Sequence, residues 1–360
     1  MEHDIFDEVF MMIDEAEEYI LVDMFLFNDF LGTETEAERY LSAELTERLL
    51  AKREARPEVT IQVITDPINT LYGGYPSPHL RALEAAGIPV ITTRLEALRD
   101  SNPLYSVWWR TFLQWFGNSD RPGWLPNPLT TEGQKLSART YLTLLNYKAN
   151  HRKVIVADTK QGEERVLSAL VSSANPHDGS SAHSNSAVRV DGPLALDVVR
   201  SEAAVADFSR HDFVWPSEDL QTSTASTDAS STIAVQLVTE EAIEDRLLSA
   251  INQAGSGDQV DVAVFYLSDR EVVEAFKAAD KRGARLRLLL DANKDAFGRE
   301  KNGVPNRQVA HELMKHTSGN TEVRWCNTHG EQCHSKLLLV TRGETTELVI
   351  GSANFTRRNL

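Results

Sequence analysis

The sequence predicts an α/β protein made of two similar units, each a mixed sheet covered by helices. Three observations support this fold class. Helical segments alternate with short strands rich in Val, Ile and Leu, and the order of segments in residues 1–215 recurs in 233–360. A Ser- and Thr-rich segment, 216–232, separates the two parts. The length of 360 residues is sufficient for two domains of roughly 150 residues each.

The first part begins with helical periodicity, because Ile5, Phe6, Val9 and Phe10 lie on one face of a helix. Apolar runs without alternation then indicate strands that are buried on both faces. The expected elements after the first helix are a strand at 19–27, a helix at 44–55, a strand at 59–66, a helix at 79–90 and a strand that starts at His151.

The second part repeats this order with helices at 239–254, 270–283 and 307–316, and with strands at 260–268, 285–291 and from His334 onward. In both parts the second strand ends in an aspartate, Asp66 or Asp291. We expect each of these residues to cap the following turn, with a place at the rim of an active site as the alternative.

The predicted domains are a first repeat at 1–215, a flexible linker at 216–232 and a second repeat at 233–360. Both ends of the sequence are abrupt. We therefore expect the second repeat to be cut short at its C-terminal end, and a trimmed start is the corresponding expectation for the N-terminus. A pseudo-twofold axis is expected to relate the two repeats, because they carry the same segments.

One insertion distinguishes the first repeat, at about 101–128. It contains four of the six tryptophans of the chain, Trp108, Trp109, Trp115 and Trp124. Tryptophan suits a membrane interface, so the insertion can be a lipid-facing lid. An extra helix packed on the domain is the alternative, and the sequence favours it slightly.

The net charge of −16, from 37 basic and 53 acidic residues, disfavours a protein that coats nucleic acid or an anionic bilayer. The sequence has no uninterrupted apolar run of about 18 residues and no secretory signal at its start. We therefore expect a cytoplasmic protein, with peripheral contact at the inner membrane as an option. The sequence does not predict an oligomeric state.

The strongest functional signal is a pair of His-x-Lys motifs, each followed downstream by Ser-x-Asn. Residues i and i+2 of a strand point to the same face, so each motif presents its two polar side chains together. The candidate residues are His151 and Lys153 with Ser173 and Asn175 in the first repeat, and His334 and Lys336 with Ser352 and Asn354 in the second.

These residue types suit a phosphate group. Lysines supply positive charge, and amides and hydroxyls donate hydrogen bonds to phosphoryl oxygens. If the two repeats meet, one histidine can attack phosphorus while the other protonates the leaving oxygen. Asp158, five residues after Lys153, can orient one of these groups. No metal and no cofactor are expected.

Other candidate residues give weaker signals. Cys326 and Cys333 lie close to His329 and His334, but their spacing matches no common zinc pattern. We expect two free thiols, with a disulfide as the alternative. His177 and His183 occur in a Gly- and Ser-rich segment after the first Ser-x-Asn. They can line the mouth of a pocket, but as loop histidines we expect them to be solvated.

The motifs HRKVIVAD with SSAN and HSKLLLVT with GSAN resemble those of the phospholipase D superfamily, His-x-Lys-x4-Asp with a downstream Gly-Ser-x-Asn, present twice. The segments LRALEAAGIPV and GSANFTRRNL look like the bacterial cardiolipin synthase branch. The resemblance implies metal-independent transfer of a phosphatidyl or similar group to water or an alcohol, through a phosphohistidine. By analogy, His151 is the nucleophile and His334 the general acid.

The sequence departs from the family pattern at two positions. Thr341 stands where the second motif would have its aspartate, and Ser172 replaces the first glycine of the downstream motif. We expect an active phosphodiesterase or phosphatidyltransferase whose partner is phospholipid, with no stable nucleic-acid partner. A nuclease of the same superfamily is the alternative, and a non-catalytic phosphate-binding relative is a third reading.

Overall fold

The computed structural model describes residues 3–131, 133–222, 233–296 and 299–360. The chain forms two compact units. The first unit comprises Met1–Val171, Asn175–Ser181 and Arg189–Leu237, and the second comprises Ser172–Ala174, Ala182–Val188 and Val238–Leu360. Two short pieces of the first repeat, 172–174 and 182–188, therefore belong to the second unit.

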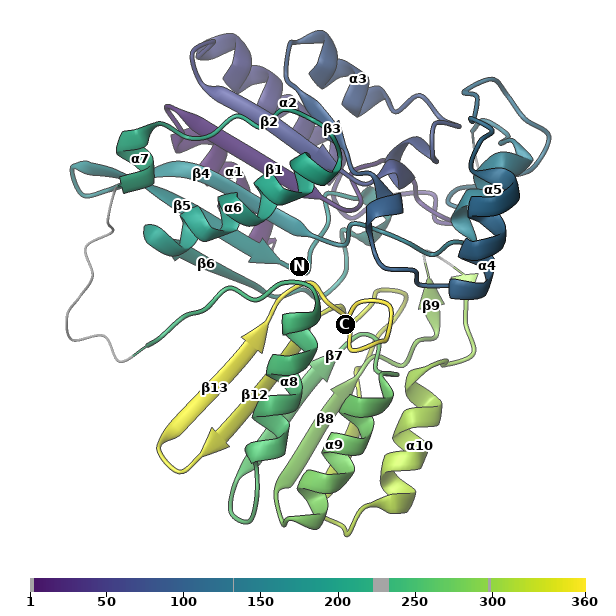
Figure 1. Ribbon diagram of the computed structural model, residues 1–360, viewed down its shortest axis with the longest axis vertical. Coiled ribbons are helices and arrows are strands. Elements are labelled where there is room, and N and C mark those ends of the chain that lie inside the picture. The colour runs from purple at the N-terminus through teal and green to yellow at the C-terminus, as the bar shows by residue number, and fades with distance from the viewer. Residues whose placement is uncertain (1–2, 132, 223–232, 297–298) are drawn as a thin grey trace. The chain divides into compact units, whose positions relative to one another are not determined.

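The first unit is built on a six-stranded sheet with the order β3-β2-β1-β4-β5-β6 (Figure 1). β2 runs parallel to β1 and β3, whereas β4 runs antiparallel to β1 and β5, so the sheet is mixed as predicted. The strands are β1 Tyr19–Met24, β2 Thr60–Thr65, β3 Val90–Thr92, β4 Lys153–Gln161, β5 Glu164–Ser172 and β6 Ala187–Asp191.

Helices cover both faces of this sheet (Figure 1). Leu21 and Val156 pack in one cluster with Val199 of α6, and all six residues of β1 are buried. Burial on both faces explains why this strand is a continuous apolar run. The helices outside the insertion are α1 Asp4–Glu15, α2 Leu41–Ala55, η1 Pro67–Thr70, α3 Pro78–Ala85, η2 Leu95–Ala97, η4 Asp178–Ser180, α6 Pro193–Phe208 and α7 Glu218–Thr222.

The second unit has a five-stranded sheet with the order β11-β8-β7-β12-β13. Its parallel and antiparallel pairs match β3-β2-β1-β4-β5 of the first unit one for one. The strands are β7 Gln259–Val264, β8 Arg285–Leu290, β11 Thr321–Trp325, β12 Lys336–Arg342 and β13 Thr345–Ile350, with a separate two-stranded sheet of β9 Asp295–Ala296 and β10 Arg299–Glu300.

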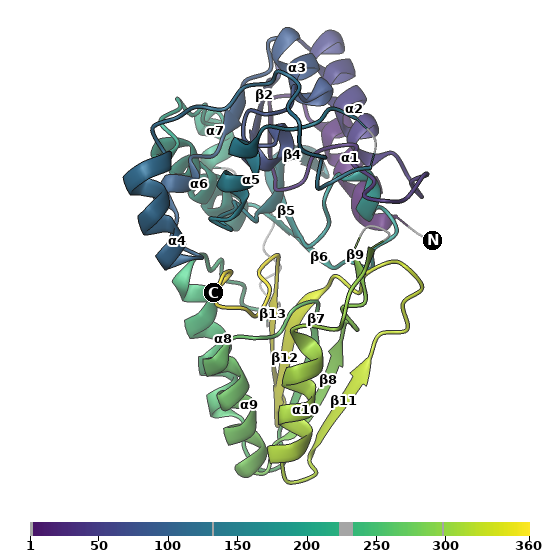
Figure 2. The same cartoon turned by 90° about the vertical axis from the view of Figure 1, so that its right-hand side faces the viewer.

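Helices α9 and α10 lie on one side of this sheet in Figure 2. Alternate residues of β7 and β8 are buried, and those between them are half-buried or exposed. Phe276 of α9 is among the fully buried residues of the core. The helices are α8 Glu241–Gln253, α9 Arg270–Lys281 and α10 Asn306–His316.

Several predicted boundaries differ from the structure. The helix expected at 79–90 ends at Ala85, because Gly87 adopts a positive φ of 73° and terminates it. Val90 then starts the short edge strand β3, which the sequence analysis did not anticipate. The corresponding edge strand of the second unit, β11, was also not anticipated.

The insertion forms α4 Pro103–Trp108 and the π-helical turn η3 Trp109–Leu113, and α5 Ala138–Leu144 follows the insertion. Trp109 is buried, and the Arg139 guanidinium lies 4.0 Å from the centroid of its ring. Leu104, Val107, Trp108 and Phe112 of the same helical segment are exposed. The segment is therefore packed on the domain, as expected, only on the side that carries Trp109.

The linker expected at 216–232 is described only up to residue 222, and 223–232 lie outside the described residues. Its first part forms the short helix α7, whose Leu220 is buried in the core of the first unit. Among the helices of the described residues, none is both long and apolar enough to cross a membrane.

Candidate functional site

In the first unit, the His-x-Lys motif lies where β4 begins. The side chain of Lys153 is fully buried, and its ammonium donates a hydrogen bond of 2.8 Å to the carbonyl of His151. The same Nζ lies 3.3 Å from His151 Nδ1. The Phe25 ring contacts both side chains, with its centroid 4.7 Å from the imidazole centroid and 4.9 Å from the ammonium.

The second unit repeats this arrangement at the start of β12. Lys336 is 1% exposed, and its ammonium donates to the carbonyl of His334. The Phe265 ring lies 4.9 Å from the His334 ring and 5.2 Å from the lysine nitrogen. Each predicted His-x-Lys pair is therefore a folded cluster of an imidazole, a buried ammonium and an aromatic ring.

The sequence analysis missed the two phenylalanines. The register of the sheets explains their equivalence, because Lys153 pairs with Met24 and Lys336 pairs with Val264, each just before the phenylalanine. Aligning the predicted strands 19–27 and 260–268 on this register would have revealed an aromatic residue at the same position in both. A phenylalanine face next to a buried ammonium offers a cation–π contact.

The Ser-x-Asn segments follow the strands that pair with the two His-x-Lys strands. Val154 pairs with Val171 in the first unit and Leu337 pairs with Ile350 in the second, so each Ser-x-Asn begins beside a His-x-Lys start. Asn175 is buried, and its Oδ1 accepts from the backbone N–H of Leu26 at 3.2 Å.

Asn354, the second-unit counterpart of Asn175, is 5% exposed, and its Oδ1 has no hydrogen-bond partner in the structure. A buried amide oxygen without a partner is unfavourable, so a ligand or a water with a hydrogen to donate would stabilise this position. The half-buried Ser352 lies two residues earlier.

Asn185 is a site residue that the sequence analysis did not find. Its Oδ1 lies 3.0 Å from Nδ1 of His334 and accepts a 2.9 Å hydrogen bond from the Ser173 hydroxyl. The segment around Asn185 reaches this position because Ser184 and His334 form a backbone hydrogen bond of 2.7 Å. Oδ1 is an acceptor only, so the contact favours the His334 tautomer that carries its proton on Nδ1.

Buried acids surround Lys153. Burial lowers the pKa of this lysine to about 7, although the nearby carboxyls of Asp23 and Asp66 act in the opposite direction. Burial also raises the pKa of Asp66 to about 7 and raises the pKa of Asp23. Glu202 lies beside Asp23, and burial raises its pKa well above its usual range. Ionisable groups with shifted pKa values are therefore concentrated around Lys153.

The structure does not place Asp158 with the site residues. Its carboxylate lies in the middle of β4, where it accepts hydrogen bonds from the backbone N–H groups of Glu17, Glu18 and Tyr19 at 2.8 to 3.2 Å. Arg165 adds an ion pair of 2.7 Å. Asp158 thus stabilises the connection between α1 and β1. Its oxygens accept hydrogen bonds from the backbone rather than from His151.

This position explains why Thr341 can replace the second aspartate. In the second unit a hydrogen bond within the connection between α8 and β7 stabilises it, because Asp258 accepts from the N–H of Gly255 at 2.9 Å. Thr341 pairs with Gln259 within the sheet. The absence of a carboxylate at residue 341 therefore removes no group that contacts His334.

The loop histidines and the cysteines differ from expectation. His177 and His183 are buried rather than solvated, and burial lowers the pKa of His177 to about 4. The rings of His183 and His334 lie 5.9 Å apart between centroids. Cys326 and Cys333 form a disulfide, so the expectation of two free thiols is wrong.

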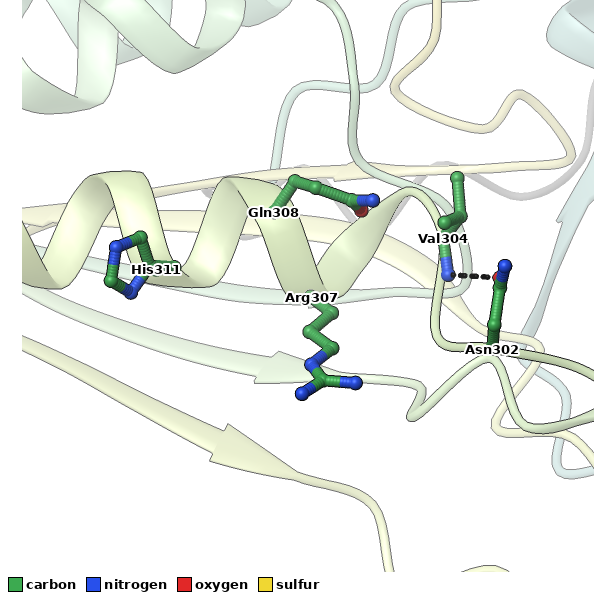
Figure 3. A pocket seen from close by; sticks show the side chains of 5 residues that line it. All are labelled: Asn302, Val304, Arg307, Gln308 and His311. Atoms are coloured by element: carbon green, nitrogen blue, oxygen red, sulfur yellow. Dashed lines mark hydrogen bonds between the residues drawn. The ribbon is translucent and has the colours of Figure 1, made fainter.

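A hollow of 530 Å³ lies beside the start of α10 (Figure 3). Val304, Arg307 and His311 are among its lining residues, and the N–H of Val304 donates to the side chain of Asn302. None of the His-x-Lys or Ser-x-Asn residues lines it. We therefore do not assign the phosphate chemistry to this hollow.

The position of Lys153 predicts a pH dependence of anion binding. With a pKa of about 7, its ammonium is charged below pH 7 and loses the charge as the pH rises. The dissociation constant for sulfate, which does not titrate in this range, should therefore rise roughly tenfold between pH 6 and 8.5. Isothermal titration calorimetry at a series of pH values measures it.

The matched variants are Lys153→Arg, which keeps its charge and should flatten the profile, and Lys160→Arg on the exposed part of β4, which should not alter it. A dissociation constant that stays level across this range in the unmodified protein would contradict the assignment.

The contacts of Asp158 predict that its loss affects folding. The Asp158→Ala variant leaves three backbone N–H groups without their acceptor and removes one ion pair of Arg165, so the free energy of unfolding should fall by about 2–4 kcal/mol. Urea denaturation followed by circular dichroism measures it. Unchanged stability combined with a lost histidine titration would instead place Asp158 in the site.

Comparisons with known proteins agree with this description. A family model described as "Cardiolipin synthase, PLD-like domain" matches residues 247–360. No curated protein sequence matches the chain. Among solved structures, phosphatidylserine synthase from Haemophilus influenzae Rd KW20 is 10% identical, with a TM-score of 0.53, over 93% of this chain and 73% of that chain.

Polyphosphate kinase from Porphyromonas gingivalis is 14% identical with a TM-score of 0.51, over 99% of this chain. The match spans only 41% of the length of that kinase. A phospholipase D family member, Nuc from Salmonella typhimurium, matches 32% of this chain with 21% identity and a TM-score of 0.25, which adds nothing to the fold assignment.

At these identities the structural matches establish the fold alone: α/β, with two mixed sheets and flanking helices. The resemblance to the phospholipase D superfamily is thereby confirmed for residues 247–360, which the family model matches.

Proposed function

We propose that the chain is a phospholipase D-type enzyme that transfers a phosphatidyl group from a phospholipid to water or an alcohol. The observation that carries the proposal is the duplicated cluster of histidine, buried lysine and phenylalanine, one in each unit. An ammonium that is held beside an imidazole supplies charge for a phosphoryl oxygen next to a nucleophile.

The proposed reaction has two steps. In the first, an imidazole nitrogen of His151 attacks phosphorus, the bond from phosphorus to the headgroup oxygen breaks, and His334 gives its proton to that oxygen. In the second, water or an alcohol attacks the phosphohistidine, loses its proton to His334 and releases His151. Lys153, Lys336 and the Ser-x-Asn side chains stabilise the phosphoryl oxygens in both steps.

The exposed side of the insertion favours phospholipid over nucleic acid as the substrate. Large apolar side chains follow one another at helical spacing there, and Trp115 and Phe116 are 74% and 66% exposed. We call Leu104, Val107, Trp108, Phe112, Trp115 and Phe116 the aromatic patch. Residues 101–128 carry only three charged side chains in a chain whose net charge is −16, and one of them, Arg110, forms an ion pair with Asp100.

A patch of this composition suits the interface of a bilayer, where aromatic rings contact both acyl chains and headgroups. We therefore propose peripheral membrane contact through the aromatic patch. Duplex nucleic acid, in contrast, is bound through clustered Lys and Arg. A nuclease acting on phosphodiesters of nucleic acid is the alternative, because the His, Lys, Ser and Asn side chains suit either phosphodiester.

The first test is incubation of the protein with vesicles of phosphatidylglycerol and phosphatidylethanolamine, followed by mass spectrometry of the lipids. We expect cardiolipin, another transphosphatidylation product or phosphatidic acid. His151→Ala and His334→Ala should each lower kcat by at least about 10³-fold, because each removes a group that acts at phosphorus. The reaction as proposed uses no metal, so EDTA should leave kcat unchanged.

The matched control is His316→Ala, which replaces an exposed histidine at the end of α10 and should leave kcat unchanged. Unaltered lipids together with cleavage of a single-stranded oligonucleotide would overturn the phospholipid proposal in favour of the nuclease. Turnover that survives in either histidine variant would contradict the assignment of that histidine.

The aromatic patch gives a separate prediction for membrane binding. The double variant Trp115→Ser with Phe116→Ser removes two exposed rings, so its partition coefficient onto phosphatidylglycerol vesicles should fall at least tenfold, or about 1.4 kcal/mol. Co-sedimentation with vesicles measures the coefficient. Trp215→Ser, at an exposed tryptophan outside the insertion, is the control. An equal fall of the partition coefficient in both variants would show that the aromatic patch is not the site of membrane contact.

A further inference from the structure

Asp66 divides its two carboxylate oxygens between two distant parts of the chain. The residue follows β2 and is fully buried. Oδ1 accepts from the backbone N–H of Ile68 at 2.8 Å, which confirms that Asp66 caps the following turn. Oδ2 accepts from the backbone N–H of Asn150 at 2.7 Å. Asn150 is the residue immediately before His151.

Asp291 makes the same two contacts in the second unit. It follows β8 and is 3% exposed. Oδ1 accepts from the N–H of Asn293 at 2.6 Å, again capping the turn. Oδ2 accepts from the N–H of Cys333 at 2.7 Å, and Cys333 is the residue immediately before His334.

Capping explains only half of each set of contacts. A serine or an asparagine caps a turn with one acceptor atom, and a capping residue need not be buried. Here a carboxylate is removed from solvent, which is costly unless both oxygens are satisfied. The second oxygen satisfies a backbone N–H at the same place in both units, although the residues that carry it, Asn150 and Cys333, differ.

In the first unit the side chain of Asn150 is hydrogen-bonded as well. Asn150 Nδ2 donates to both oxygens of Asp23, at 3.0 and 2.9 Å, and to Thr93 Oγ1 at 3.0 Å. The main chain and the side chain of Asn150 are thus both fixed to the sheet. His151 is the next residue, and its carbonyl accepts a hydrogen bond from the Lys153 ammonium.

We propose that Asp66 and Asp291 are positioning residues for the two histidines, each fixing the backbone immediately before the imidazole. The inference rests on the proposed function, because it assumes that His151 and His334 act on the substrate. The physical basis is that an imidazole held against phenylalanine and lysine keeps one geometry only if the preceding peptide cannot rotate. A small displacement of a reacting group lowers kcat strongly.

Serine variants separate positioning from capping. In Asp66→Ser and Asp291→Ser, the hydroxyl can still cap the turn, but it offers no second oxygen that reaches Asn150 or Cys333. We expect kcat on phosphatidylglycerol vesicles to fall roughly 10- to 100-fold, with KM changed by less than about threefold. We also expect the titration of the affected histidine, followed by NMR of its ring protons, to shift from that of the unmodified protein.

The matched control is Asp269→Ser. Asp269 is a 5% exposed aspartate that caps α9 by accepting from the N–H groups of Glu271 and Val272. Its variant should lose stability at most, with kcat and both histidine titrations unchanged. If a serine variant does not fold, Asp66→Asn or Asp291→Asn provides a side chain of the same shape with one acceptor oxygen fewer.

Two outcomes would overturn the inference. One is a serine variant that behaves as Asp269→Ser does, with reduced stability but unchanged kcat and histidine titration. The other is a kcat loss that accompanies an equal rise in KM, which would indicate lost binding rather than lost orientation. The histidine titration needs no substrate. It therefore tests the positioning role even if the protein acts on no phospholipid and the proposed function fails.

Discussion

The structure of both candidate sites depends on the burial of a lysine ammonium. Lys153 and Lys336 begin their strands with almost no solvent exposure, and an isolated buried ammonium is strongly unfavourable. Each is compensated in the same way, by the carbonyl of the histidine two residues earlier and by the face of a phenylalanine. The groups that stabilise each buried ammonium are therefore also the groups that hold its histidine, because the carbonyl belongs to that histidine and the phenylalanine contacts its ring.

The two copies of the site differ in what surrounds them. Both have a buried aspartate, Asp66 or Asp291, but the first also has the buried carboxyl of Asp23, and its Arg152 forms an ion pair of 3.1 Å with Glu202. In the second unit the sheet register places Ala263 where the first has Asp23, and His334 contacts the neutral amide of Asn185. The surroundings of the two histidines therefore differ, although the motifs that contain them are almost identical.

The sequence was sufficient for the parts that depend on local patterns. Apolar runs predicted β1 and β7, and the spacing of His and Lys predicted that they share a face. Short edge strands such as β3 were missed because three residues do not establish a period. Asn185 could not be found in this way, since its contact with His334 joins segments far apart in the sequence. The sequence left the exposure of Trp115 open between a lipid-facing lid and a packed helix, because an apolar helical stripe has the same sequence whether it faces a core or solvent.

Asp158, the aspartate that ends the family motif, shows why the role of a motif residue needs a structural test. Asp158 and Lys153 are both in β4, but strand geometry separates residues five apart by about 16 Å and places them on opposite faces. The carboxylate therefore cannot serve the imidazole, and the backbone N–H groups from Glu17 to Tyr19 take both of its oxygens. A carboxylate in that position stabilises the connection into β1, and β1 leads to Phe25. The second repeat reaches Phe265 through a connection that Asp258 holds instead, so Thr341 needs no charge.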